Sequence, residues 1–176
     1  MQMLDAGGWP VLTDSLRQPD VDNPKGYYEL EQVKELDKSG DKSWLYQHRG
    51  KAIKIVSHFL THLPADLNYQ VIFILRDLDE ILMSQKKMLT RRGESGESAS
   101  AEKMKTRFDW HLKRTRYILR EQPNMDVLYL QYHEVVNNPR PEIEQIRGFL
   151  GGGLELEPMC RVVDAQLYRN RASEKP

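Results

Sequence analysis

The stretch Gln70-Val71-Ile72-Phe73-Ile74-Leu75-Arg76-Asp77-Leu78-Asp79-Glu80-Ile81-Leu82-Met83-Ser84 decides the fold of this 176-residue chain. Its first residues form a continuous, β-branched apolar run, which is typical of a parallel strand covered on both faces. Residues 77–92 then place apolar side chains at helical spacing, and Asp77 and Glu80 form a capping-box-like start. The stretch therefore predicts a buried strand followed directly by a helix.

Strands and helices alternate on both sides of this unit. On the N-terminal side we predict a short strand at 10–13, short helices at 28–36 and 43–48, and a strand at 52–56. On the C-terminal side we predict a mobile loop at about 93–101, a helix at 101–120, a strand at 126–130 and a helix at 141–150. This alternation indicates an α/β fold, with a mostly parallel sheet flanked by helices in one domain spanning residues 1–176.

The composition excludes several classes of protein. Lys plus Arg and Asp plus Glu each number 26, so the chain lacks the basic excess of a general nucleic-acid binder and any anion site must be local. Cys160 is the only cysteine, which excludes an intramolecular disulfide and a multi-cysteine zinc site. The sequence has no membrane-spanning apolar run and no secretory signal at its start. We expect a soluble, cytoplasmic protein without a nucleic-acid partner.

Arg76 and Ser84 are the strongest candidate site. Arg76 ends the buried strand, at the edge where open α/β sheets bind ligands. Ser84 lies eight residues later, about 10 Å along the following helix. A guanidinium folded along that helix would meet the Ser84 hydroxyl on one phosphate. The structural alternative is an Arg in a surface ion pair and a Ser on a solvated face.

The stretch from Ile74 to Ser84 resembles the 3′-phosphate-binding motif of sulfotransferases that use 3′-phosphoadenosine 5′-phosphosulfate (PAPS). Residues 23–29 (Asn-Pro-Lys-Gly-Tyr-Tyr-Glu), 51–57 and 128–139 also resemble bacterial members of this family. The resemblance implies a P-loop NTPase-like fold, PAPS as co-substrate without a metal, and sulfuryl transfer to an unidentified hydroxyl or amine acceptor. It also implies that Arg76 and Ser84 hold the 3′-phosphate.

Sulfuryl transfer needs a base that takes the proton of the acceptor. The resemblance implies two candidates for this role. Glu29 ends the 23–29 motif, in a region where some members place a catalytic carboxylate. His58 follows the strand at 52–56, where cytosolic members carry a catalytic His, although Val56 replaces the Lys of their motif. A Glu at a helix start and an exposed loop His are the structural alternatives.

The sequence departs from the family in two places. Asp77, Asp79 and Glu80 put three carboxylates in the first helical turn, where they would repel an anion at the helix tip, so we expect the phosphate beside the helix. Helix capping explains these residues better than a metal. The Gly-rich phosphosulfate loop has no counterpart, and residues 1–6 resemble the end of a helix. We therefore expect a sequence that lacks the family's first strand and loop, and a chain that is marginally stable and inactive alone.

Two other functions remain open. A P-loop kinase or another nucleotide-dependent transferase would need a GxxxxGK[ST] loop and a magnesium-binding carboxylate after a strand, and this sequence shows neither. A non-catalytic nucleotide-binding remnant is the third hypothesis. Among weaker candidates, Trp110 and His111 are expected to pack on one face of their helix. Residues 167–169 are a further candidate to approach the cofactor, one that no spacing argument supports.

Overall fold

The computed structural model describes residues 1–176 except 15, 22, 39, 92, 94–100 and 169–176. The loop predicted at 93–101 therefore lies almost entirely outside the described residues. The strands are β1 (Val11–Leu12), β2 (Ala52–Ile53), β3 (Tyr69–Leu75) and β4 (Met125–Gln131). The helices are α1 (Gln2–Ala6), α2 (Ser43–Gln47), α3 (Leu78–Arg91), α4 (Ala101–Glu121), α5 (Tyr132–Asn137), α6 (Pro139–Phe149) and α7 (Leu156–Arg161). Three short 3₁₀ helices are η1 (Glu31–Glu35), η2 (Ser57–His62) and η3 (Ala165–Leu167).

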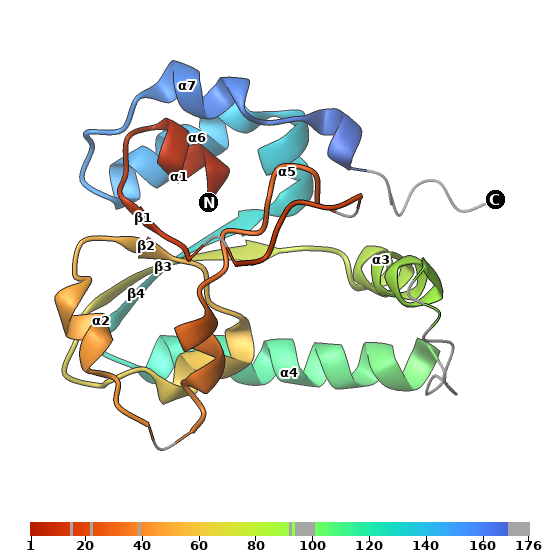
Figure 1. Cartoon of the computed structure of the whole chain (residues 1–176), viewed down its shortest axis with the longest axis horizontal. Coiled ribbons are helices and arrows are strands. Elements are labelled where there is room, and N and C mark those ends of the chain that lie inside the picture. Colours follow the sequence, from red (N-terminus) through yellow and green to blue (C-terminus); the bar gives the residue numbers. More distant parts are fainter. Residues whose placement is uncertain (15, 22, 39, 92, 94–100, 169–176) are drawn as a thin grey trace.

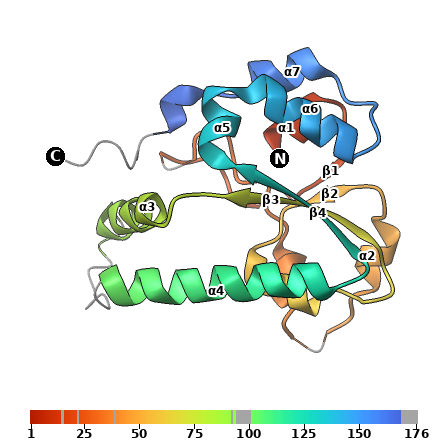
Figure 2. The ribbon, with the colours of Figure 1, turned by 180° about the vertical axis from the view of Figure 1, so that it is seen from behind.

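All strand pairing in the described residues is parallel. β1 pairs with β2, and β3 pairs with β4 in a continuous register from Tyr69–Met125 to Leu75–Gln131. The two ladders share no strand pairing within the described residues. Helices α1, α6 and α7 lie on one side of the strands and α4 lies on the other (Figures 1 and 2). The predicted α/β architecture with parallel strands and flanking helices is confirmed.

The apolar core consists of two clusters. The larger cluster joins β4 to the α5–α7 layer, with the buried side chains Leu130, Val135, Ile143, Ile146, Leu154 and Met159. The second cluster lies under η1, α2 and η2, with Val33, Leu36, Leu45, Phe59 and Leu67. Helix α1 packs on the larger cluster and ends at Gly7, whose missing side chain leaves space for Met159: an added Cβ would lie 2.7 Å from the Met159 Cγ. Close packing of this kind makes the N-terminal helix part of the core.

The long, periodic segments formed as predicted, as did the short helix at 43–48, which is α2, and two other short segments deviate. The predicted helix at 101–120 and the strands at 70–75 and 126–130 correspond to α4, β3 and β4. The predicted helix at 28–36 contains only the five-residue 3₁₀ helix η1, and the strand at 52–56 contains only the two residues of β2. The expectation that β3 is covered on both faces is wrong, because none of its residues is buried and Ile74 is 44% exposed. Among the described residues β3 pairs along one edge only, which leaves its end less covered.

None of the described helices combines the length and the apolarity that crossing a membrane requires.

Candidate functional site

The register of the β3–β4 ladder places Arg76 beside Tyr132. Leu75 and Gln131 are partners at the end of the ladder, so the next residue of each strand lies at the same edge of the sheet. The Arg76 guanidinium lies 4.5 Å from the centre of the Tyr132 ring and 5.8 Å from the centre of the Tyr168 ring. Both distances suit a cation–π contact. Arg76 thus stands at the carboxyl ends of two parallel strands, as predicted.

The partner that holds Arg76 is Glu80, in the first turn of α3. Arg76 Nε donates a hydrogen bond to Glu80 Oε2 over 3.2 Å, and the Tyr168 hydroxyl donates to Glu80 Oε1. Glu80 is only 3% exposed, whereas the Arg76 side chain is 25% exposed. Burial and the hydrogen bond to Glu80 raise the pKa of Tyr168 to about 12. A buried carboxylate therefore fixes one edge of the guanidinium.

The predicted capping box is half right. Asp77 Oδ1 accepts from the backbone N–H groups of Asp79 and Glu80, over 2.8 and 3.2 Å, so Asp77 caps α3. The Glu80 carboxylate, however, pairs with Arg76 and Tyr168, because a cation and a hydroxyl are available at the strand end. Asp79 pairs with Lys105 of α4 over 2.7 Å. Each of the three carboxylates of the first turn is thus engaged by a neighbour.

Ser84 is half-buried on α3, one turn beyond Glu80. Residues four apart on a helix share a face, so Ser84 lies on the same side of α3 as the carboxylate that holds Arg76. Within the described part of the chain no hydrogen bond to the Ser84 hydroxyl occurs, and none joins Ser84 to Arg76. Ser84 therefore shares a face of α3 with the carboxylate that holds Arg76, without a hydrogen bond between Ser84 and Arg76.

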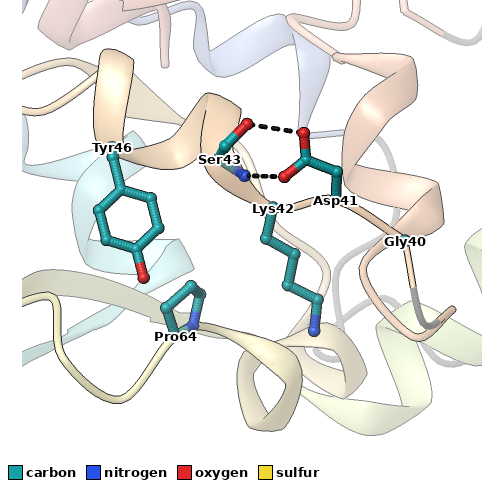
Figure 3. A pocket seen from close by; sticks show the side chains of 6 residues that line it. All are labelled: Gly40, Asp41, Lys42, Ser43, Tyr46 and Pro64. Carbon is teal, nitrogen blue, oxygen red and sulfur yellow. Dashed lines mark hydrogen bonds between the residues drawn. The ribbon is translucent and has the colours of Figure 1, made fainter.

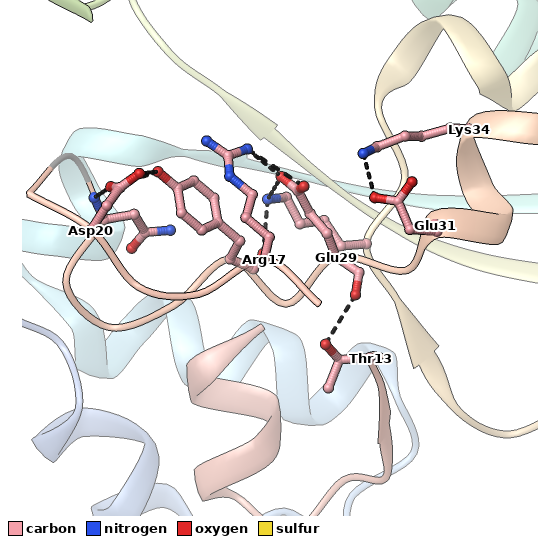
Figure 4. Close-up of polar contacts among 9 residues, drawn as sticks. Thr13, Arg17, Asp20, Glu29, Glu31 and Lys34 are labelled. Atoms are coloured by element: carbon pink, nitrogen blue, oxygen red, sulfur yellow. Dashed lines mark hydrogen bonds and ion pairs between the residues drawn. The ribbon is translucent and has the colours of Figure 1, made fainter. Parts of the chain in front are cut away.

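Glu29 lies in a second group, on the wall of a cleft of about 310 Å³ formed by the loop of residues 13–29. Its carboxylate accepts from Arg17 over 3.2 Å and from Lys54, just after β2, over 3.4 Å (Figure 4). The Arg17 guanidinium also lies 3.3 Å from the centre of the Tyr27 ring. Glu29 is 24% exposed. It is therefore a partly accessible carboxylate between two cations.

His58 is exposed on η2, and its ring stacks on that of the neighbouring Phe59 at 3.8 Å between centres. The adjacent Ser57 makes a contact that the sequence did not indicate: its hydroxyl lies 2.8 Å from His111 Nε2 on α4. His111 therefore ties η2 to α4. The expectation that Trp110 and His111 pack on one face of their helix is only half right. Trp110 is 61% exposed, with the Arg114 guanidinium 5.3 Å from its ring centre, whereas His111 faces η2.

Another cleft, of about 570 Å³, is lined by residues 40–43, Tyr46 and Pro64 (Figure 3). Its polar side chains already have partners: Lys42 Nζ donates to the carbonyl of His62, and the Tyr46 hydroxyl donates to Asp66. Asp41 accepts from the backbone and hydroxyl of Ser43, which lowers its pKa. The described residues contain no group of three His, Cys, Asp or Glu side chains arranged to hold a metal ion.

The comparisons with known proteins give no family assignment. No family model matches the chain, and no significant match was found among curated proteins or solved structures. Within the described residues no hydrogen bond or ion pair joins the Arg76 group to Glu29, so the two groups are separate: Arg76 follows β3, and Glu29 contacts Lys54, just after β2.

Proposed function

We propose that this chain is a sulfotransferase-like protein that binds the 3′-phosphate of PAPS at Arg76 and Ser84 and places an acceptor next to Glu29. The proposal depends mainly on the position, the pairing and the exposure of Arg76. It stands at the carboxyl end of a parallel ladder, is held by Glu80 through Nε, and remains 25% exposed. A partly exposed guanidinium at this edge suits a phosphate, which Arg binds through paired N–H donors.

Ser84 supports the same assignment. Its hydroxyl lies on the α3 face that also carries Glu80, so a phosphate beside this face would meet one charged and one neutral donor. Each carboxylate of the first turn already has a partner: Asp77 caps α3, Asp79 pairs with Lys105, and Glu80 pairs with Arg76. A phosphate beside α3 lies away from Asp77 and Asp79 at the tip, and Arg76 offsets the Glu80 charge on the face where the phosphate would bind.

The cleft at Glu29 suits the acceptor half of the reaction. In the proposed step the acceptor oxygen or nitrogen forms a bond to sulfur, the bond from sulfur to the 5′-phosphate oxygen breaks, and the acceptor proton passes to Glu29. The products are the sulfated acceptor and adenosine 3′,5′-bisphosphate. Arg17 and Lys54 keep the Glu29 carboxylate in place at the cleft wall. His58 is the second candidate base, and within the described residues its ring makes no hydrogen bond or ion pair that would hold it in place.

Isothermal titration calorimetry with adenosine 3′,5′-bisphosphate and 5′-AMP tests the proposal, because the two nucleotides differ only in the 3′-phosphate. We expect the chain to prefer the bisphosphate. Arg76→Lys keeps a cation beside buried Glu80 but removes the paired N–H donors of the guanidinium, and it should weaken bisphosphate binding by roughly 1.5–3 kcal/mol. Ser84→Ala should cost about 1 kcal/mol.

The matched control is Arg140→Lys, which makes the same change at an exposed Arg paired with Glu157 on the α6–α7 layer. It should leave both affinities unchanged. Equal affinity of the wild-type chain for the two nucleotides would refute the 3′-phosphate assignment. Preference for ATP with Mg²⁺ would instead support a kinase-like transferase.

A further inference from the structure

The hydrogen bonds of Arg76 engage one edge of its guanidinium. Nε donates to Glu80, and the flat face lies against the Tyr132 ring at 4.5 Å. Among the described residues, neither Nη group has a hydrogen-bond partner. A guanidinium has five N–H donors in a fixed plane, so this arrangement holds the Arg76 side chain while its terminal donors stay available.

Glu80 is itself held by a residue from the far end of the chain. Tyr168 follows η3 and lies 88 residues from Glu80, yet its hydroxyl donates to the Glu80 carboxylate. The Tyr168 ring also packs edge-on against Tyr132, with 5.3 Å between the ring centres. In Figure 1 the blue end of the ribbon lies beside α5, which begins at Tyr132. Tyr132 and Tyr168 thus enclose the Arg76–Glu80 pair.

A buried ion pair is weak evidence for stability, because removing two charges from water costs about as much as their attraction returns. Such a pair is more readily explained by the geometry that it imposes. We propose that Glu80 and Tyr168 are positioning residues, which fix the Arg76 guanidinium so that its Nη groups meet the 3′-phosphate without a loss of side-chain freedom on binding. This inference rests on the proposed function and adds two residues to its nucleotide site.

Replacing Glu80 tests the inference, because positioning and electrostatics predict opposite changes in the affinity for adenosine 3′,5′-bisphosphate. Glu80→Gln removes a negative charge close to the proposed phosphate, so electrostatics alone would tighten bisphosphate binding. Positioning predicts the opposite: about tenfold weaker binding, the size expected when a long side chain must be ordered again. Tyr168→Phe leaves every charge in place and should weaken binding in the same direction, by a smaller factor. The matched control is Asp79→Asn, one residue from Glu80, which removes the same charge and should not weaken binding.

Nuclear magnetic resonance of the Arg76 Nε–H group gives a readout that does not depend on the nucleotide. The wild-type chain should show a slowly exchanging Nε–H signal, assigned by its loss in Arg76→Lys, and Glu80→Gln should speed its exchange. Tighter binding by Glu80→Gln, or an unchanged Nε–H signal in that variant, would overturn the positioning role. If the wild-type chain shows no preference for the bisphosphate, the proposed function fails, and the Nε–H signal still decides whether Glu80 fixes Arg76.

Discussion

Removing the Arg76 side chain should destabilise the fold, because it leaves the Glu80 carboxylate buried without its cation. Glu80 is 3% exposed, and its carboxylate also accepts a hydrogen bond from the neutral Tyr168 hydroxyl. Breaking a buried pair costs about 3–5 kcal/mol, and the 25% exposure of Arg76 places this case at roughly 3 kcal/mol. For a chain of this length that loss lowers the melting temperature by roughly 6–12 °C.

A double-mutant cycle separates the pair from general damage. Glu80→Gln alone should cost about 1 kcal/mol, the net value of a hydrogen bond. Added to Arg76→Ala, it should raise the free energy of unfolding by about 2 kcal/mol, because the unpaired charge is gone. Urea unfolding followed by tryptophan fluorescence and circular dichroism measures all four forms. The reasoning would be refuted if Arg76→Ala lowered the free energy of unfolding by less than about 0.5 kcal/mol, as expected for an exposed pair. It would also be refuted if adding Glu80→Gln to Arg76→Ala restored no stability.

Three further predictions concern packing, pH and the base. Gly7→Ala places a Cβ 2.7 Å from the Cγ of the core residue Met159 and should lower the free energy of unfolding by about 1–3 kcal/mol. Gly148→Ala, in α6 with open space around it, should instead raise it by about 0.5–1 kcal/mol, as thermal unfolding would show. The folded-state pKa of Tyr168 is raised from 10.0 to about 12, so the stability that this hydroxyl contributes is complete below pH 10 and disappears as the pH rises to about 12. In urea unfolding between pH 10 and pH 12, Tyr168→Phe should therefore lose less stability than the wild-type chain. In assays of PAPS turnover by a longer form of the protein that includes a phosphosulfate loop, Glu29→Gln should lower the rate by roughly 10²–10⁴-fold and His58→Ala by less. Full activity of both variants would discard both as bases.

The sequence predicted those features that depend on period and on strand ends. The 101–120 segment forms α4 because its apolar side chains recur at helical spacing. Arg76 was predicted at a ligand-binding edge because a charged residue directly follows a long apolar strand. The pairing of Arg76 with Glu80 was not predicted: Arg76 precedes α3, which begins at Leu78, so the four-residue spacing of helix neighbours does not apply to it directly.

The contacts that complete the site come from tertiary packing and leave no local signal. Tyr168 reaches Glu80 across 88 residues, and Ser57 reaches His111 across 54. Neither pair follows a helical or strand period, so the sequence showed the residues without showing their partners. Short elements such as η1 were poorly predicted for a related reason: five residues carry little periodicity, and their neighbours decide their conformation.

The most direct test of the central claim is a crystal structure of the chain with adenosine 3′,5′-bisphosphate. We predict that the 3′-phosphate lies within hydrogen-bonding distance, about 3 Å, of the Nη groups of Arg76 and of the Ser84 hydroxyl, with the Arg76–Glu80 pair intact. A 3′-phosphate bound elsewhere, for example in the cleft beside Arg17 and Glu29, would contradict the account.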